Sequence, residues 1–186
     1  METHYETSIP RPAERSPEPR RSMLRELVET FVPAIAIVLV INLLLAQPRT
    51  VHGQSMEPSL HENERVIVDL VSLRWRAPER GEIIVLRLPE QDTDPLIKRV
   101  VGLPGDTVAI KNGKVLVNGV VLDEPYLDQV TPGRMGTKVV PEAHVFVLGD
   151  NRGASNDSRY FGMVPYERIV GRAWIRYWPP AEAGLF

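Results

Sequence analysis

The chain has no cysteine among its 186 residues. This absence excludes disulfide bonds, a cysteine nucleophile and thiolate metal sites, and it leaves the cellular compartment undecided by redox arguments. The four histidines, His4, His52, His61 and His144, are scattered along the chain. They lack a metal-ligand spacing such as HExxH, so we expect neither a metal nor another cofactor.

The sequence also lacks an excess of charge of one sign. It carries 22 basic and 24 acidic side chains, for a net charge of −2, so it does not indicate a nucleic-acid partner. No internal repeat of solenoid type is visible. Hydrophobic residues make up 43% of the chain, which is enough to bury the core of one compact domain with an appendage.

Residues 1–29 lack a sustained apolar periodicity before Met23 and are rich in Pro, Glu and Arg. This composition predicts a disordered tail that leads into a short amphipathic entry. The next stretch, TFVPAIAIVLVINLLLAQP (residues 30–48), contains no charged residue. Its length is close to the roughly 20 residues that a helix needs to cross the hydrocarbon layer. We therefore expect one transmembrane anchor helix at 30–48.

Two other interpretations of residues 30–48 stay open, a buried helix of a soluble protein and a cleavable signal peptide. A core helix that is apolar on every side is unusual in so small a domain, and no A-x-A cleavage pattern appears. More basic residues precede the run than follow it: Arg11, Arg15, Arg20, Arg21 and Arg25 against Arg49 and Arg65. This bias predicts a single-pass protein of the cell membrane, with a cytoplasmic N-terminus and an extracytoplasmic domain at 49–186.

Short runs rich in Val and Ile follow the apolar segment, among them RVIVDLVSL, GEIIVLRL and HVFVLGD. They are separated by turn residues and not by helical runs, which predicts an all-β domain of coiled antiparallel sheets or a barrel. Two Asn-Gly pairs, Asn112-Gly113 and Asn118-Gly119, predict tight hairpin turns. Residues 107–142 contain both pairs and the Gly-rich TPGRMGTK, and we expect them to form a small β-rich insertion.

Ser55 lies in VHGQSMEPSL, between a glycine-containing turn and a proline. A serine needs a base before it can act as a nucleophile. Lys98 occupies the apolar, strand-like run LIKRVVGLPGD, where desolvation would favour its neutral amine and let it take the serine proton. The same run also allows Lys98 to point to solvent beside Arg99, and the histidines are alternative bases.

A third stretch, VFVLGDNRGASNDSRYFG (residues 145–162), joins an apolar strand to a polar, turn-forming loop. Asp157 and Arg159 are spaced to pair, and Ser155 or Ser158 could donate to a neighbour. Only Asp150 and Asp157 supply carboxylates, and the spacing does not match an EF-hand, so we do not expect a metal here.

In this order, the apolar run and the motifs SMEPSL, RGEIIVLR, IKRVVGLPGDTV and GDNRGASNDSRYFG resemble the motifs of bacterial type I signal peptidases. The resemblance extends from the apolar run to about Val164. It implies a membrane-bound serine endopeptidase that removes signal peptides from exported preproteins after small residues. It also implies an all-β fold of coiled antiparallel sheets with a smaller β-rich insertion, and it makes preproteins and the lipid bilayer the expected partners.

Carried over by position, the resemblance makes Ser55 the nucleophile and Lys98 the general base that leads to an acyl-enzyme. Ser155 would form a hydrogen bond with the lysine amine and orient it. Asp157 and Arg159 would form a supporting ion pair.

The resemblance further implies that Asp150 and Arg152 hold the loop, and that Met56 and Pro58 shape the turn that presents Ser55. Some family members have a serine two places before the nucleophile, whose hydroxyl helps to hold the oxyanion. Here that position is Gly53, so the oxyanion would depend on backbone donors.

Three rival functions stay open. A self-cleaving serine–lysine protease of the repressor type shares the pair of residues, although the apolar run and the long polar loop argue against a soluble protein of that kind. A serine–histidine hydrolase would use His52, His61 or His144. A membrane-tethered β-domain would bind without catalysis.

Overall fold

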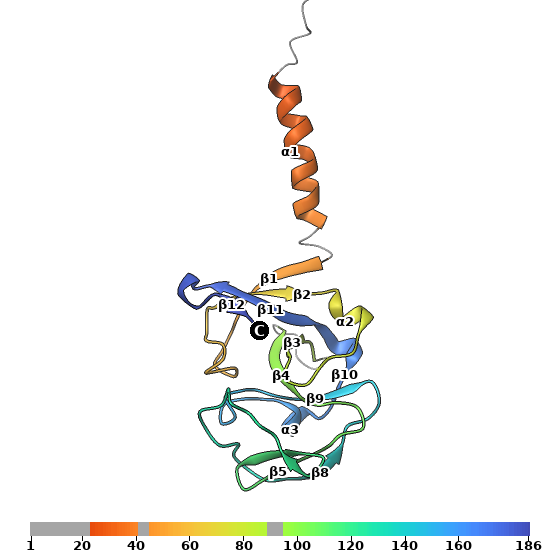
Figure 1. The fold of residues 1–186 in the computed structure, drawn as a ribbon, viewed down its shortest axis with the longest axis vertical. Coiled ribbons are helices and arrows are strands. Elements are labelled where there is room, and N and C mark those ends of the chain that lie inside the picture. Colours follow the sequence, from red (N-terminus) through yellow and green to blue (C-terminus); the bar gives the residue numbers. More distant parts are fainter. Residues whose placement is uncertain (1–22, 41–44, 89–94) are drawn as a thin grey trace, which may run out of the picture. The chain divides into compact units, whose positions relative to one another are not determined.

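The computed structural model describes residues 23–40, 45–88 and 95–186 (Figure 1). The chain divides into two compact units, residues 1–37 and 38–186. The described part of the first unit is helical, and the strands found among the described residues all lie in the second unit.

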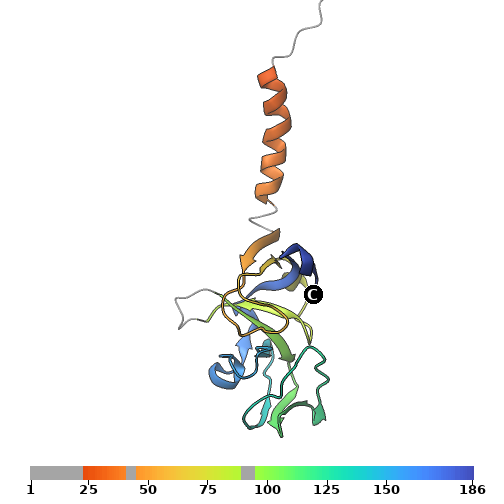
Figure 2. The same ribbon diagram turned by 90° about the vertical axis from the view of Figure 1, so that its left-hand side faces the viewer.

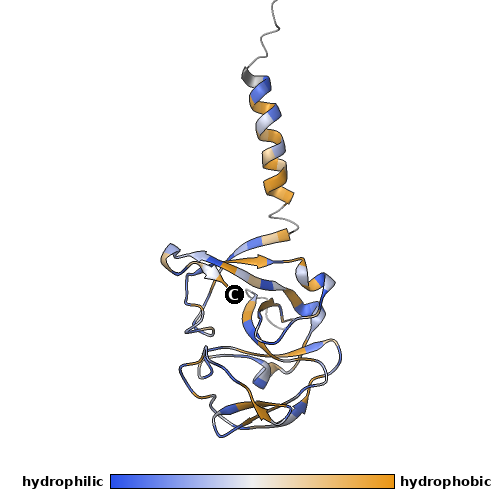
Figure 3. Cartoon of the chain, in the orientation of Figure 1, coloured by the Kyte–Doolittle hydropathy of each residue, from blue (hydrophilic) through white to orange (hydrophobic). Residues whose placement is uncertain are grey.

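Helix α1 (Met23–Val40) begins at Met23 and not at Thr30, so residues 23–29 are helical where the sequence predicts a tail. Much of α1 is coloured hydrophobic (Figure 3), and its large apolar side chains, such as Phe31 and Ile35, are about half exposed. Within the described residues, no helix combines the length and the apolar character needed to cross a membrane. Residues 41–44 of the predicted anchor lie outside the described residues.

The end of the predicted anchor is wrong, because residues 46–48 belong to strand β1 (Ala46–Thr50). β1 pairs antiparallel with β2 (Arg65–Asp69) and forms the edge of the main sheet. Pro48 cannot donate to a neighbouring strand, and an edge strand is where a proline is tolerated. The charge-free run therefore includes part of a helix and part of a strand. The absence of charge alone does not show where the helix ends.

The main sheet has eight strands in the order β1-β2-β11-β3-β4-β9-β10, with β12 paired to β11. All of its strand pairs are antiparallel, which confirms the prediction of an all-β antiparallel domain. The remaining strands of this sheet are β3 (Ile83–Leu86), β4 (Leu96–Gly102), β9 (His144–Leu148), β10 (Val164–Pro165), β11 (Ile169–Trp178) and β12 (Gly184–Leu185). Short helical segments connect them: α2 (Ser72–Trp75), α3 (Ser158–Phe161), η2 (Tyr166–Arg168) and η3 (Pro180–Glu182).

A second sheet of four strands lies between residues 107 and 139, in the segment where the sequence predicts an insertion. Its order is β7-β6-β5-β8, with β5 (Thr107–Lys111), β6 (Lys114–Val117), β7 (Val120–Val121) and β8 (Met135–Val139). Asn112 and Gly113 both have positive φ, 52° and 76°, as do Asn118 and Gly119. These angles fit the primed turns that Asn-Gly favours, so both predicted hairpins are confirmed.

The second sheet shares its hydrophobic core with the main sheet. Figures 1 and 2 show it at the opposite end of the second unit from β1. One cluster of buried side chains joins Val108, Ile110 and Val115 of the second sheet to Phe146 and Leu148 of β9. The insertion is therefore packed onto the sheet that carries the catalytic candidates.

Candidate active site

Ser55 is presented by the loop between β1 and β2. Buried apolar side chains on both sides of it, Val51, Met56 and Leu60, pack into the core cluster of the main sheet. Gly53 takes a left-handed φ of 76°, which a residue with a side chain rarely adopts. Met56 is 1% exposed and anchors the turn immediately after the serine.

Pro58 is exposed and follows a cis peptide bond with Glu57. The turn continues through backbone hydrogen bonds from Glu57 N to Gln54 O and from Leu60 N to Met56 O, at 3.2 and 2.9 Å. The residues predicted to shape the turn therefore lie in it.

Lys98 does not point to solvent, because its side chain is only 2% exposed. It lies in β4 opposite Ile84 of β3, and strand alternation places it on the same face as Val100. Its Nζ lies 2.8 Å from Ser55 Oγ and 2.8 Å from the carbonyl oxygen of Ile97. The structure thus brings the predicted nucleophile and the predicted base into hydrogen-bond contact.

Burial lowers the pKa of Lys98 from its ordinary 10.5 to about 8, although the negative charges of Asp157 and Asp150 act in the opposite direction. A substantial fraction of this amine is therefore neutral near physiological pH. A neutral amine in contact with a hydroxyl can accept its proton.

The hydrogen bond expected between Ser155 and Lys98 is not formed. The Ser155 side chain is buried, and its Oγ has no hydrogen-bond partner among the described residues. The lysine amine is instead directed at Ser55 and at the Ile97 carbonyl. Ser158, the other serine considered for this loop, accepts a hydrogen bond from Val147 N at 3.0 Å.

Asp157 and Arg159 form the expected ion pair, with Arg159 Nε 2.8 Å from Asp157 Oδ1. The same carboxylate accepts hydrogen bonds from the backbone N–H groups of Arg159 and Gly149, at 3.2 and 3.1 Å. Asp157 is fully buried, so it links the start of α3 to the end of β9.

Asp150 and Arg152 hold the loop through partners that sequence reasoning missed. Arg99 Nη2 and Nε bind the two oxygens of Asp150 at 2.6 and 2.9 Å. Arg152 pairs with Glu124 from the insertion. The position of Arg99 next to Lys98 is a weak sequence signal that Arg99 belongs to the site. No sequence feature near Glu124 indicates that it pairs with Arg152.

Gly149 lies between Ser55 and Ser155, a close approach that also escaped the sequence analysis. A β-carbon at Gly149 would overlap both the Ser155 hydroxyl and the carbonyl oxygen of Ser55. The Asn151 N–H donates to that same carbonyl at 3.1 Å. A glycine directly after an apolar strand can mark such a contact, but its partners are visible only in the fold.

The described histidines make contacts that do not involve Ser55. His61 Nδ1 lies 3.5 Å from Glu64 Oε1, and His144 Nδ1 lies 2.7 Å from the Glu142 carbonyl. His52 lines a small cavity of about 200 Å³ together with Pro48, Arg49, Thr50, Val85, Pro95 and Ile97. Ile97, which lines this cavity, also accepts a hydrogen bond from the Lys98 amine through its carbonyl.

Among the described residues, one group offers three potential metal ligands, His61, Glu64 and Glu182. Arg176 Nη1 already lies 3.2 Å from Glu64 and 3.3 Å from Glu182. A cation therefore occupies the space between the carboxylates, and the group does not suit a metal ion.

The profile of the family described as signal peptidase, peptidase S26, matches residues 24–178. A probable signal peptidase I-2 from Synechocystis sp. is 40% identical over 178 residues, covering 93% of this chain and 82% of that protein. Signal peptidase IB of Staphylococcus aureus is 34% identical, with 86% of this chain and 94% of that protein covered.

Thylakoidal processing peptidase 1 of Arabidopsis thaliana is 34% identical over 87% of this chain and 50% of its own. A crystal structure of a signal peptidase I from Enterococcus faecalis V583 has 35% identity and a TM-score of 0.47, covering 52% of this chain and 97% of that one. Since the family profile spans most of the sequence and two of these relatives align over most of their own length, the chain belongs to the signal peptidase family, peptidase S26, and is a serine peptidase, a hydrolase.

Proposed function

We propose that this peptidase removes signal peptides from exported preproteins, with Ser55 as nucleophile and Lys98 as general base. The contact of 2.8 Å between Lys98 Nζ and Ser55 Oγ, made by a lysine that is 2% exposed, is the observation that carries this assignment. The names of the relatives, which are signal peptidases, supply the substrate class.

The reaction begins when neutral Lys98 takes the Ser55 proton as Oγ attacks the scissile carbonyl. The lysine ammonium then gives that proton to the departing amine as the peptide bond breaks, which leaves an acyl-enzyme on Ser55. A water molecule, deprotonated by the same amine, attacks the ester and releases the signal peptide. The Ile97 carbonyl, 2.8 Å from Nζ, orients the amine throughout.

The oxyanion of the tetrahedral intermediate would be held by backbone donors, chiefly the Ser55 N–H, because Gly53 supplies no hydroxyl. Removal of one such donor typically costs about 10²–10³ in turnover where it is present. The Ser155 hydroxyl is buried and has no hydrogen-bond partner in the described part of the chain, so it is available to bond the lysine amine after a small movement of either side chain.

The residue before the scissile bond would bind in the cavity lined by His52, Val85 and Ile97. Its volume of about 200 Å³ is below the roughly 300–1,000 Å³ that is typical of small-molecule sites, which suits small side chains. We expect a peptide with alanine at this position to be cut at least ten times faster than one with leucine. Equal rates for the two peptides would contradict this use of the cavity.

The apolar segment that begins at Thr30 would tether the enzyme to the cell membrane, with the N-terminus in the cytoplasm and the β-domain outside. A signal peptide is itself apolar, so enzyme and substrate would meet in the same bilayer. Confinement of both to one surface raises their effective concentration.

The decisive experiment compares the wild type with Ser55→Ala and Lys98→Ala in detergent, on a synthetic preprotein peptide, with the products identified by mass spectrometry. We expect cleavage by the wild type alone. Lys98→Arg should also be inactive, because arginine stays protonated. His52→Ala, His61→Ala and His144→Ala should retain activity.

Three results would replace the proposal with a rival. Cleavage by Ser55→Ala would remove the nucleophile from the mechanism. Binding of the peptide without cleavage by the wild type would indicate a tethered β-domain that only binds. Cleavage of the chain itself, with the peptide left intact, would indicate a self-cleaving protease.

A further inference from the structure

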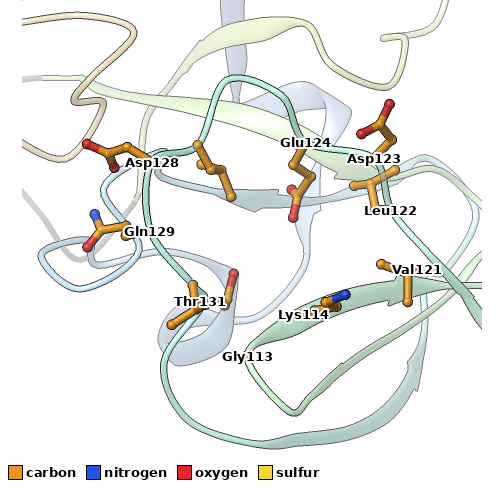
Figure 4. Close-up of a pocket in the computed structure, with 11 residues that line it drawn as sticks. Gly113, Lys114, Val121, Leu122, Asp123, Glu124, Asp128, Gln129 and Thr131 are labelled. Atoms are coloured by element: carbon orange, nitrogen blue, oxygen red, sulfur yellow. The ribbon is translucent and has the colours of Figure 1, made fainter.

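Residues 122–131, here called the bridging loop, connect the insertion to the catalytic loop through Glu124. Arg152 Nη2 lies 2.5 Å from Glu124 Oε1, and Arg152 Nη1 lies 3.2 Å from Oε2. Thr131, at the other end of the bridging loop, accepts a hydrogen bond from the same guanidinium. Two positions of the bridging loop therefore hold one cation. Figure 4 shows the loop curving around a cavity that both residues line. The volume of this cavity is about 530 Å³.

Arg152 requires this carboxylate because its guanidinium is taken out of water. The Arg152 residue is 1% exposed, and the Glu124 side chain is 8% exposed. A buried charge that loses its partner is strongly destabilised, much more than one at the surface. The Glu124 carboxylate thus fixes where the Arg152 side chain can lie.

Arg152 in turn holds the backbone that touches both serines of the site. Its Nε donates to the Gly149 carbonyl at 3.0 Å. Gly149 is packed against the Ser55 carbonyl and the Ser155 hydroxyl so closely that a β-carbon would not fit. The Asn151 N–H also donates to the Ser55 carbonyl. A shift of this segment would therefore move the nucleophile relative to Lys98.

Tyr126 provides a second connection from the same loop to the base. Its hydroxyl donates to Glu124 Oε1 at 2.8 Å, and its ring lies under the Arg99 guanidinium, with 4.0 Å from Cζ to the ring centroid. Arg99 binds both oxygens of Asp150 and directly follows Lys98 in β4. The bridging loop thus contacts the chain next to the base as well as the loop next to the nucleophile.

We infer that Glu124 is a positioning residue, which acts through Arg152 to hold Ser55 at the correct distance from Lys98, with Tyr126 supporting the same arrangement. This inference rests on the proposed function. It gives the insertion a catalytic purpose, since the insertion supplies the counter-charge for the catalytic loop.

The test measures kcat and KM of the full chain in detergent on the synthetic preprotein peptide, for wild type, Glu124→Gln and Tyr126→Phe. Asp123→Asn is the matched control, because it removes one negative charge from the adjacent, exposed position of the same loop. A displacement of about 1 Å at a reacting group can cost about 10²-fold in rate. We expect Glu124→Gln to lose 10- to 100-fold in kcat with KM within about twofold, and Asp123→Asn to match the wild type. Tyr126→Phe should lose about two- to fivefold.

A double variant separates positioning from general destabilisation. Glu124→Gln leaves the Arg152 charge unpaired, and Arg152→Gln leaves the Glu124 charge unpaired. The two substitutions combined remove both charges. If the two residues act as a unit, the double variant should be no slower than the slower single variant. Thermal unfolding of each variant, followed by circular dichroism, gives the folded fraction by which kcat is normalised.

The inference is overturned if normalised kcat of Glu124→Gln stays within twofold of the wild type, or if the two losses simply multiply in the double variant. If the Glu124 variants do not fold, Tyr126→Phe provides the test. An unchanged kcat of Tyr126→Phe would then contradict the inference. These outcomes are distinct from a failure of the proposed function. That failure would appear as cleavage by Ser55→Ala, whatever the Glu124 variants do.

Discussion

At the scale of single residues, the chemistry depends on the environment of one amine. Lys98 is buried in β4 beside the apolar strand β3, and this burial lowers the pKa of Lys98 to about 8. Two buried carboxylates, Asp157 and Asp150, oppose the shift, yet each is paired with an arginine. The pairing moderates their effect and lets desolvation dominate.

We expect the activity to rise with pH and to level off above about pH 8, because only the neutral amine of Lys98 can accept the Ser55 proton. Below that pH, kcat/KM should fall about tenfold per pH unit. The measurement is the initial rate of peptide cleavage from pH 5 to pH 10. An inflection near 6.5, the ordinary pKa of histidine, would instead point to His52, His61 or His144.

Lys98 should also make stability depend on pH. Between pH 8 and 10.5 the unfolded chain binds this proton and the folded chain does not, so the free energy of unfolding rises with pH across that window. Below pH 8 the folded state carries the full cost of the charged amine, about 3 kcal/mol for a pKa lowered from 10.5 to about 8. Lys98→Met should therefore raise the free energy of unfolding at pH 7, and raise it less at pH 10.

Denaturant titrations of wild type and Lys98→Met at the two pH values would measure this difference. A variant that is less stable than the wild type at pH 7 would show that the hydrogen bonds of Lys98 outweigh its desolvation.

At the scale of elements, the end of β9 is where strand and catalytic loop meet, and Gly149 makes that junction possible. Its N–H binds Asp157, its carbonyl accepts from Arg152, and its α-carbon faces Ser55 and Ser155 without room for a side chain. The geometry of the loop is thus set by a residue that takes no part in the chemistry.

Gly149→Ala should lower both activity and stability, because the added methyl group must push apart the two serines. Overpacking of this kind costs about 1–3 kcal/mol, and we expect kcat to fall by at least tenfold. Gly153→Ala is the control, since its β-carbon would meet no atom nearer than 3.9 Å. Cleavage rates and thermal unfolding of both variants provide the comparison. Equal behaviour of the two would contradict the close packing at Gly149.

Several elements were predictable because their signals are local. Runs of Val and Ile predicted the strands. The pairs Asn112-Gly113 and Asn118-Gly119 predicted the hairpins, because Asn and Gly adopt the positive φ that these turns require. The boundary at residues 46–48 was missed, because an apolar, charge-free run is compatible with a helix and with a strand. The pairs Arg152–Glu124 and Arg99–Asp150 join residues 28 and 51 positions apart, so only the fold brings them together.

At the scale of the whole molecule, the chain divides into a unit of residues 1–37, which contains most of α1, and a unit of residues 38–186, which contains the β-domain. Within the described residues, the large apolar side chains of α1 are about half exposed and do not belong to a buried core. A bilayer would cover them. This exposed apolar surface supports the proposed membrane tether.

Ile35→Lys combined with Leu39→Lys should abolish co-flotation of the full chain with lipid vesicles, because each lysine costs about 2.5–3.5 kcal/mol at the centre of a bilayer. Cleavage of a water-soluble peptide in detergent should change less than twofold. Ile35→Leu with Leu39→Ile serves as the control and should float like the wild type. Flotation of the lysine variant would show that other residues anchor the chain.

The cluster that joins Val108, Ile110 and Val115 to Phe146 and Leu148 has a consequence for the durability of the enzyme. Heat or a denaturant cannot unfold the four-stranded sheet and leave β9 intact, because the side chains of both pack in one hydrophobic cluster. Loss of turnover and loss of fold should therefore coincide, and no partly melted form should survive that still cuts its substrate.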